Sequence, residues 1–276
     1  MVTLSHTFPA LLFFIALTGC SGKGVEDYIA DLSHPEKTVR LQASYELVIS
    51  GPAAVEALLR HAADGSDSLQ FISAQILGRI GDKRGIPLLR QFARSPNDFV
   101  RREAILSLGQ MGDPSIGAFL LVALASDKEA EVRSAAAQSL GNLRDTLAVS
   151  PLAQALKDPA PLVRQQAVAA LHRLWTPRAE AAILSTLQDR DETVRYIAVQ
   201  SLGKHRVRAA LNHLRKALRD TSIWVRTEAA RALGGLGDTS AVEDLVRVLK
   251  QHDGPDHQAA RAALQELTGL DYVLVQ

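Results

Sequence analysis

The sequence is poor in cysteine and in aromatic residues. Cys20 is the only cysteine among 276 residues, and Phe, Trp and Tyr together make up 5% of the chain. A single cysteine excludes an intramolecular disulfide, so packing alone must hold the fold together. Hydrophobic residues nevertheless account for 47% of the chain. They are mostly Ala, Leu, Val and Ile, and they suffice for a sizeable core.

An excess of charge of either sign is also missing. The chain has 31 Lys and Arg against 30 Asp and Glu, which gives a formal net charge of +1. Nucleic-acid-binding domains usually carry a marked basic excess. We therefore expect no nucleic acid among the partners of this protein.

Motifs of common enzyme classes are absent as well. The sequence contains no Gly-x-Ser-x-Gly elbow, no Walker-type phosphate loop and no zinc-binding helix motif. His252 and His257 are five residues apart in a polar segment, which is poor spacing for one helix face and weak evidence for a metal site. We expect no metal, no cofactor and no catalytic residues.

A unit of about 31 residues instead repeats from residue 25 to the C-terminus. Its clearest phrase is Val-Arg-x-x-Ala-x-x-x-Leu-Gly, as at Val132 to Gly141. When the copies are aligned, the Arg position of the phrase forms a column, which we call the Arg column: Arg40, Gln70, Arg101, Arg133, Arg164, Arg195, Arg226 and His257. Its successive spacings are 30, 31, 32, 31, 31, 31 and 31. Such regularity predicts a stack of small units, each in contact mainly with its neighbours.

Each unit has the pattern of two helices. In residues 114–143, Pro114 suits a first helical turn, and Ile116, Phe119 and Leu120 follow at helical spacing. Ser126 and Asp127 break this helix, and a second helix is predicted to end at Gly141 and the pair at 144–145. Two further columns support a continuous core. Small residues stand three positions after the Arg column, and leucine stands seven positions after it in every unit: Leu47, Leu77, Leu108, Leu140, Leu171, Leu202, Leu233 and Leu264.

The Asp-x₅-Arg loop, the Val-Arg start and the Leu-Gly-x-hydrophobic-Gly-Asp ending together resemble HEAT repeats. The ending is seen at Leu77 to Asp82, Leu108 to Asp113 and Leu233 to Asp238. The most similar variety is the short repeat named after phycobilisome lyases. The resemblance implies an all-α fold, a right-handed α-solenoid of about seven to eight helix pairs over residues 25–276. We expect about seven full units and a partial C-terminal cap. Function stays open, because such repeats serve many unrelated proteins.

The N-terminus does not follow the repeat. An apolar run at residues 10–17 is too short to span a bilayer and has the length of a secretory signal. Leu17-Thr18-Gly19-Cys20 resembles the lipobox of bacterial lipoproteins. That resemblance implies a signal peptide at 1–19, lipidation of Cys20 and a short tether at 20–24. Ser21 resembles the residue typical of outer-membrane sorting, so we expect a lipid-anchored, periplasm-facing envelope protein, with the outer membrane favoured.

The Arg column has two interpretations. It could form a phosphate-binding ladder, or its arginines could pair with loop acids that cap the second helices, since Asp127, Asp158, Asp189 and Asp220 each lie six residues before an Arg. We favour the structural ladder, made of Arg101, Arg133, Arg164, Arg195 and Arg226 together with Arg40.

Units five and six deviate most from the repeat. They replace the Gly-Asp ending with basic and aromatic residues, and six Lys or Arg but no acid lie between 204 and 219. Positions one, five and nine after the Arg column should share the concave face that solenoids use for partners. The candidate partner-binding residues are Arg173, Trp175, Tyr196, Gln200, Lys204, Arg206 and Arg208. An ordinary solvated basic face with a structural Trp is an equal alternative. Trp224 is expected to pack against a neighbouring loop.

These observations favour a non-enzymatic envelope scaffold or adaptor that binds a protein or peptide partner. The alternative is an enzyme or chromophore-handling protein of the bilin-lyase-like HEAT type. A scaffold should purify without colour or metal, which distinguishes the two.

Overall fold

The computed structural model describes residues 22–251 and 253–272, which form eight helix pairs. The first helices of the pairs are α1 (Val25–Asp31), α3 (Pro52–His61), α5 (Ile86–Phe92), α7 (Gly117–Ser126), α9 (Val149–Ala155), α11 (Pro177–Leu184), α13 (Leu211–Ala217) and α15 (Val242–Gln251). The second helices are α2 (Lys37–Ser50), α4 (Asp67–Ile80), α6 (Asp98–Met111), α8 (Ala130–Leu143), α10 (Pro161–Leu174), α12 (Glu192–Lys204), α14 (Ile223–Leu236) and α16 (Pro255–Thr268). Short 3₁₀ turns precede five first helices: η1 (Lys83–Gly85), η2 (Pro114–Ile116), η3 (Thr146–Ala148), η4 (Arg208–Ala210) and η5 (Thr239–Ala241).

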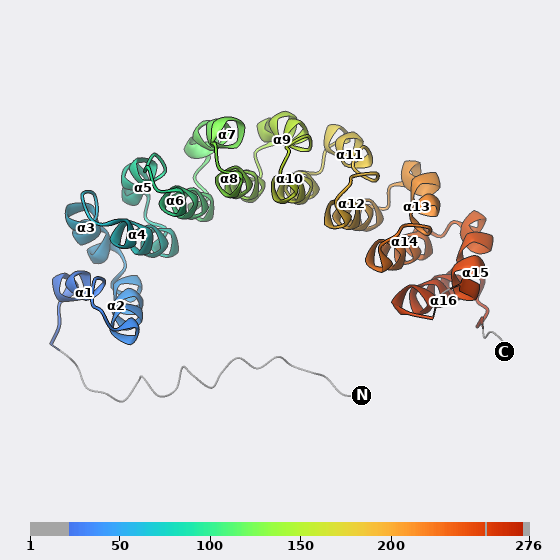
Figure 1. Cartoon of the computed structure of the whole chain (residues 1–276), viewed down its shortest axis with the longest axis horizontal. Helices are drawn as coiled ribbons and strands as arrows, with labels where there is room; N and C mark the ends of the chain where they lie inside the picture. The colour runs from blue at the N-terminus through green and yellow to red at the C-terminus, as the bar shows by residue number, and fades with distance from the viewer. Residues whose placement is uncertain (1–21, 252, 273–276) are drawn as a thin grey trace.

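The pairs form a curved α-solenoid. The second helices line the inner, concave side of the arc and the first helices form its outer layer (Figure 1). The all-α solenoid predicted from the repeat is thus confirmed. The expected partial C-terminal cap is wrong, because α15 and α16 make a full eighth pair. Among the described helices, none combines the length and the apolar character that crossing a bilayer requires.

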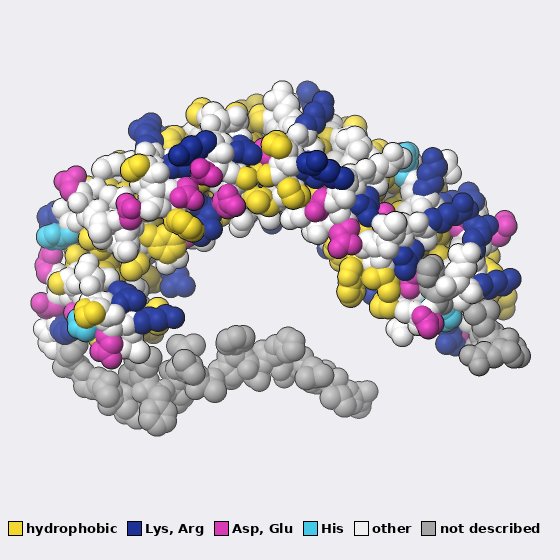
Figure 2. Space-filling view, viewed as in Figure 1, with side chains coloured by type: hydrophobic (Ala, Val, Ile, Leu, Met, Phe, Trp, Pro, Cys, Tyr) yellow, Lys and Arg dark blue, Asp and Glu magenta, His cyan; other side chains and the backbone are white. Residues whose placement is uncertain are grey.

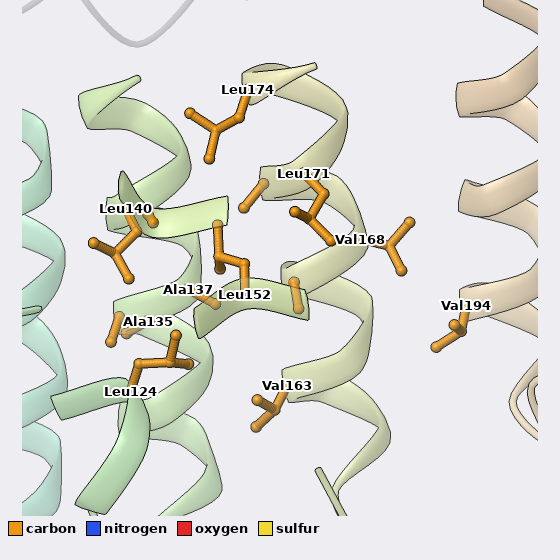
Figure 3. Packing of buried hydrophobic residues seen from close by; sticks show 14 of the residues in the cluster. Leu124, Ala135, Ala137, Leu140, Leu152, Val163, Val168, Leu171, Leu174 and Val194 are labelled. Atoms are coloured by element: carbon orange, nitrogen blue, oxygen red, sulfur yellow. The ribbon is translucent and has the colours of Figure 1, made fainter. Parts of the chain in front are cut away.

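The core runs the whole length of the arc because the repeat columns face inward. Every member of the Leu column is at most 1% exposed, from Leu47 in the first unit to Leu264 in the last. The small residues three positions after the Arg column are equally buried, as Ala136 and Ala198 illustrate. Figure 3 shows Leu140 and Leu171 of neighbouring second helices beside Leu152 of the outer layer. Each unit therefore buries its apolar surface against the next one.

The glycine of the Leu-Gly phrase lies inside the second helix, not at its end. It allows neighbouring second helices to pack closely. Gly109 lies inside α6, and a Cβ added there would come within 2.4 Å of the Ser139 Cβ on α8. Gly141 likewise lies inside α8, and a Cβ added there would lie 2.9 Å from the Cα and Cβ of Ala170 on α10. The expectation that Gly141 marks the end of its helix is wrong.

The ends of the second helices explain the Gly-Asp ending. Gly81, Gly112 and Gly237 have φ between 66 and 72°, the left-handed conformation that glycine adopts most readily. The Asp that follows accepts a hydrogen bond from the backbone N–H two residues on, as Asp113 does from Ser115 at 2.8 Å. This contact starts the 3₁₀ turn of the next unit. Units four to six lack this glycine, and Arg144 and Arg206 adopt the left-handed conformation at the ends of α8 and α12, with φ 54° and 52°.

Candidate partner-binding surface

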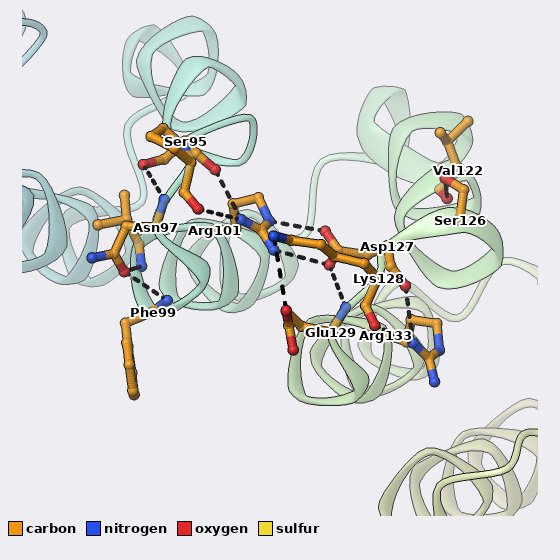
Figure 4. A network of polar contacts seen from close by, with 12 residues as sticks. Ser95, Asn97, Phe99, Arg101, Val122, Ser126, Asp127, Lys128, Glu129 and Arg133 are labelled. Carbon is orange, nitrogen blue, oxygen red and sulfur yellow. Dashed lines mark hydrogen bonds and ion pairs between the residues drawn. The ribbon is translucent and has the colours of Figure 1, made fainter.

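Five arginines of the Arg column link successive units through ion pairs, which we call rungs. In each rung, Nη1 donates to two carbonyls of its own inter-helix loop, and the side chain also binds an Asp of the next unit. Figure 4 shows this for Arg101, which donates from Nη1 to the carbonyls of Ser95 and Pro96. Its Nε and Nη2 donate to the two carboxylate oxygens of Asp127 at 3.0 and 3.1 Å. One guanidinium therefore fixes a loop and a neighbouring unit at once.

The other rungs repeat this arrangement. They are Arg133–Asp158, Arg164–Asp189, Arg195–Asp220 and Arg226–Asp256, with closest contacts of 2.7 to 2.8 Å. We had expected the loop Asp to cap the second helix, and this expectation is wrong. Its Oδ1 accepts from the residue two positions on, as Asp158 does from Ala160. The last rung uses Asp256, a residue of α16 that stands in the position normally held by Val or Leu.

The rungs shift the ionisation of their members. Burial opposes charge on Asp158, Asp189 and Asp220, but hydrogen bonds from the paired guanidinium and from backbone N–H groups outweigh it and hold each pKa below its ordinary value. The hydrogen bond to Asp189 similarly raises the pKa of Arg164. The rung arginine side chains are 4 to 14% exposed. Because Asp side chains already occupy them, these guanidiniums are poorly placed for a phosphate ligand.

The first two positions of the Arg column break this pattern. Gln70 replaces the second arginine, and Ser95 stands where the next unit would supply its Asp. Gln70 bonds only to the carbonyls of Ala63 and Gly65. Arg40 keeps its Nη1 bonds to the carbonyls of His34 and Pro35, both at 2.7 Å. Within the described residues, however, its Nε and Nη2 have no hydrogen-bond or ion-pair partner.

The candidate residues of units five and six lie at two separate places. Arg173, Lys204, Arg206 and Arg208 are exposed at the C-terminal ends of α10 and α12. Beside them, Trp175 stacks on His205 with the ring centroids 3.5 Å apart and the planes within 4°. The Trp is half-buried, so His205 already covers one face of this proposed apolar anchor.

The second place is near the N-terminus of α12. Tyr196 accepts a hydrogen bond from Gln200 at 3.1 Å, and both are half-buried. Eight residues of helix separate Tyr196 from Lys204, which corresponds to about 12 Å along the axis. Tyr196 instead lines a groove of about 250 Å³ together with Trp224. Trp224 is 60% exposed, so the expectation that it packs against a loop is wrong.

Part of the basic run is neutralised within the fold. Arg215 and Arg219 both bind Asp244 of the next unit, at 2.6 and 3.3 Å. Lys204, Arg206, Arg208 and Lys216 form no ion pair in the part of the chain that the structure describes. The remaining cations thus cluster at the ends of α12 and on α13.

The structure also reveals an apolar surface that the sequence analysis missed. Leu41, Tyr45 and Ile49 on α2 are 60%, 50% and 62% exposed, and we call them the apolar stripe. They occupy positions one, five and nine after Arg40, the spacing already assigned to the concave face. That rule, applied to the first unit as well as to units five and six, would have found them. Figure 2 shows hydrophobic side chains along the inner rim, beside α6 and again beside α14.

A groove lies where the N-terminal ends of α2, α4 and α6 meet. Its volume is about 670 Å³, and its lining includes Arg40, Asp67, Phe71, Asn97 and Phe99. We call it the N-terminal groove. Phe99 is 59% exposed, with the guanidinium of Arg102 5.7 Å from its ring centroid. Asp67 contributes the carboxylate of the lining and accepts a hydrogen bond from Asn97 at 2.8 Å.

Metal ligands do not converge in the described residues, where no group of three or more His, Cys, Asp or Glu side chains is placed to hold an ion. His172 and His205 lie close, with ring centroids 4.9 Å apart. Burial lowers the pKa of both imidazoles. Cys20 and the predicted signal peptide at 1–19 lie outside the described residues.

An arc of stacked helix pairs with an inner surface for contacts defines an α-helical repeat protein of the solenoid class. The chain belongs to the HEAT-repeat family, whose model matches residues 52–121, 117–185 and 180–265. Among curated proteins, none matches this sequence.

Several solved structures share the fold. YibA of Escherichia coli has a TM-score of 0.67 and 23% sequence identity, covering 89% of this chain and 93% of its own. An engineered protein has a TM-score of 0.50 and 22% identity, covering 88% of this chain and 78% of its own. The complex of CpcE and CpcF of phycocyanin lyase from Nostoc sp. has a TM-score of 0.48 and 22% identity, covering 94% of this chain and 100% of that chain. At these identities the likeness concerns the fold alone.

Proposed function

We propose that this protein is a non-enzymatic scaffold that binds a protein or peptide partner on its concave face. The observation that carries the proposal is the apolar stripe on α2. Leu41, Tyr45 and Ile49 are spaced four residues apart on the inner helix layer, and each is at least half exposed. Scattered exposed apolar residues are common, but a contiguous group on a concave surface is typical of an interaction site.

We place a second contact region further along the arc. The exposed cations at the C-terminal ends of α10 and α12 lie toward the other half of the arc, with Trp224 and Tyr196 near the opposite helix ends. An extended partner that follows the inner surface could contact the apolar stripe first and the basic residues further along. Arg173, Lys204, Arg206 and Arg208 would then favour acidic segments of the partner.

We further propose that the scaffold works at the cell envelope as a lipoprotein. The support is the lipobox-like Leu17-Thr18-Gly19-Cys20 after an apolar run. Three acyl chains on Cys20 would anchor the protein firmly, because each buried CH₂ contributes about 0.8 kcal/mol. Intact-mass analysis of the wild type should show an acylated N-terminus at Cys20, and Cys20→Ala should remove the lipid. A mature protein that starts elsewhere or has no lipid would contradict this assignment.

The binding function can be tested by site-specific photo-crosslinking in cells. A photoreactive phenylalanine analogue at Tyr45 should yield a discrete crosslinked protein. The matched control is Val122 on α7, which is 64% exposed but belongs to the outer layer. Crosslinks of equal yield at both positions, or none at Tyr45, would contradict the proposal. The absorption spectrum of the same purified protein tests the chromophore-handling alternative, since a scaffold should show only protein absorbance.

A further inference from the structure

The first Arg of the column differs from the five rung arginines in one respect. Arg40 holds the carbonyls of His34 and Pro35 through Nη1, six and five residues before it, as Arg164 holds those of Asp158 and Pro159. The guanidinium is therefore oriented by its own loop as in the rungs. The opposite edge, Nε and Nη2, binds both oxygens of Asp189 in Arg164. In Arg40 that edge has no partner among the described residues.

The length of the second unit accompanies the missing partner of Arg40. By register, Asp64 is the acid that should complete this rung, but the second unit is one residue shorter than the third, with a column spacing of 30 rather than 31. The shortened loop is held differently, since Gln70 bonds to the carbonyls of Ala63 and Gly65, seven and five residues before it. Asp64 is exposed and forms no ion pair in the described chain. The loop therefore leaves the guanidinium edge of Arg40 open.

Arg40 lines the N-terminal groove, so its open edge lies where a ligand can enter. Phe71 and Phe99 line the same groove and supply apolar surface. A ligand suited to it has a carboxylate for the guanidinium and apolar groups beside the carboxylate. Asp67 is the acidic side chain of the lining, and its hydrogen bond from Asn97 keeps one of its oxygens occupied.

We propose that the N-terminal groove is a carboxylate-binding subsite, in which an aspartate side chain of a protein partner completes the open rung on Arg40 while flanking apolar residues of that partner contact Phe71 and Phe99. The occupant is assigned as aspartate because each of the five closed rungs uses that side chain. The subsite rests on the proposed scaffold function and specifies which partner chemistry it recognises.

The test uses a random linear peptide library, displayed with blocked ends and selected against the full-length protein in detergent micelles. The peptides that bind should share an aspartate next to apolar residues. The matched Asp→Asn peptide should bind the wild type about tenfold more weakly or worse, because a charge-assisted hydrogen-bond pair is lost. On Arg40→Gln protein, the Asp and Asn peptides should bind equally weakly. Arg133→Gln is the control, since that arginine is already paired with Asp158. It should lower the melting temperature yet keep the preference for Asp.

Three outcomes would overturn the subsite: no enriched peptide, enriched peptides without an acidic residue, or an Asp preference that survives in Arg40→Gln. The enriched peptides are also synthesised with a free C-terminal carboxylate, and binding that appears only in this form would show that the aspartate assignment is wrong. The scaffold function is judged separately. Peptides that lose binding in a Leu41→Ser/Ile49→Ser variant but show no acidic preference would leave that function standing, whereas the absence of crosslinks at Tyr45 would contradict it.

Discussion

Arg164 and Asp189 join the fifth unit to the sixth through two hydrogen bonds of 2.8 Å, from Nε to Oδ2 and from Nη2 to Oδ1. Their side chains are only 4% and 11% exposed. Two opposite charges so far removed from water depend on each other, because either one alone would be buried without compensation. The pair also ties α10 to the loop before α12, so its effect extends beyond one unit.

Removing one member of this rung should therefore destabilise the protein strongly. We expect Arg164→Ala to lower the free energy of unfolding by about 3–5 kcal/mol, since Asp189 would stay buried without its counter-charge. The control is Arg261→Ala, because Arg261 pairs with Asp271 at the surface with 44% and 56% exposure, and such pairs contribute about 1 kcal/mol or less. Denaturant melts measure both. An equal decrease in the free energy of unfolding for both variants would contradict a strong stabilising effect of the buried pair.

The rungs also predict sensitivity to acid. The folded pKa values of Asp158, Asp189 and Asp220 lie below the ordinary value of 3.8. A lowered folded pKa gives stability that is present above pH 3.8 and disappears as the pH falls through the folded values. Melting temperatures between pH 7 and 2 should thus drop steeply below about pH 4. The Asp189→Asn variant should have a lower melting temperature at pH 7 and a smaller decrease in melting temperature below pH 4. An unchanged decrease would contradict the assignment of acid sensitivity to the rung acids.

A methyl group added at a glycine between two helices should lower stability, whereas one added at an exposed glycine of a helix should not. Gly109→Ala should destabilise by about 1–3 kcal/mol, since the new Cβ would lie 2.8 Å from the Ser139 backbone Cα. Gly235→Ala on α14 is the matched control, because nothing lies within 4 Å of its Cβ position. That change should stabilise the helix by up to about 1 kcal/mol. Destabilisation of similar size at both sites would refute the close-approach argument.

The two positions at which the rung pattern is missing, Gln70 and Ser95, offer a place to build a new rung. The column spacing from 70 to 101 is 31, as for the rungs of Arg133, Arg164 and Arg195, and the Ser95 hydroxyl already accepts a hydrogen bond from the Asn97 N–H as a rung Asp does. Gln70→Arg and Ser95→Asp should each destabilise, because each leaves a half-buried charge unpaired. The double variant should recover about 0.5–3 kcal/mol relative to the sum of the singles. A double-mutant cycle in urea measures this coupling, and strict additivity would show that the two sites do not meet.

The exposed cations after α12 predict an electrostatic effect on binding. The double variant Arg206→Glu/Arg208→Glu should bind the partner captured at Tyr45 more weakly, mainly through slower association and a changed salt dependence. Stability should change by no more than about 0.5 kcal/mol, because both side chains are exposed. Binding rates at two salt concentrations and a thermal melt check this. Equal rates for both proteins would make these cations an ordinary solvated surface.

Most of the fold could be predicted from local patterns. The Leu column and the small residues before it recur at about 31 residues in every unit, and every copy must bury the same face against its neighbour. The helix pairs, their order and the continuous core follow from that repetition. Even the pairing of Arg164 with a loop acid was expected, because both residues recur at constant spacing.

The binding surface could be predicted less well, because it depends on what the repeat does not specify. The sequence analysis followed the unusual composition of units five and six and did not apply the same spacing rule to the first unit, where it finds Leu41, Tyr45 and Ile49. How far these side chains are exposed, 50 to 62%, depends on the neighbouring helices and came from the structure. Likewise, the stack of Trp175 on His205 joins two different units, and no local pattern encodes it.

The sequence by itself determined the repeating helix pairs, their buried columns and the charges available for rungs, because these depend on spacing along one chain. Only the tertiary structure decided which acid each arginine meets. Rung partners lie in adjacent units, and whether the loop acid reaches the arginine depends on how that loop is held, as the unpaired Asp64 illustrates. For that reason Arg164 is paired with Asp189, while the Nε and Nη2 of Arg40, which lines the N-terminal groove, have no partner among the described residues.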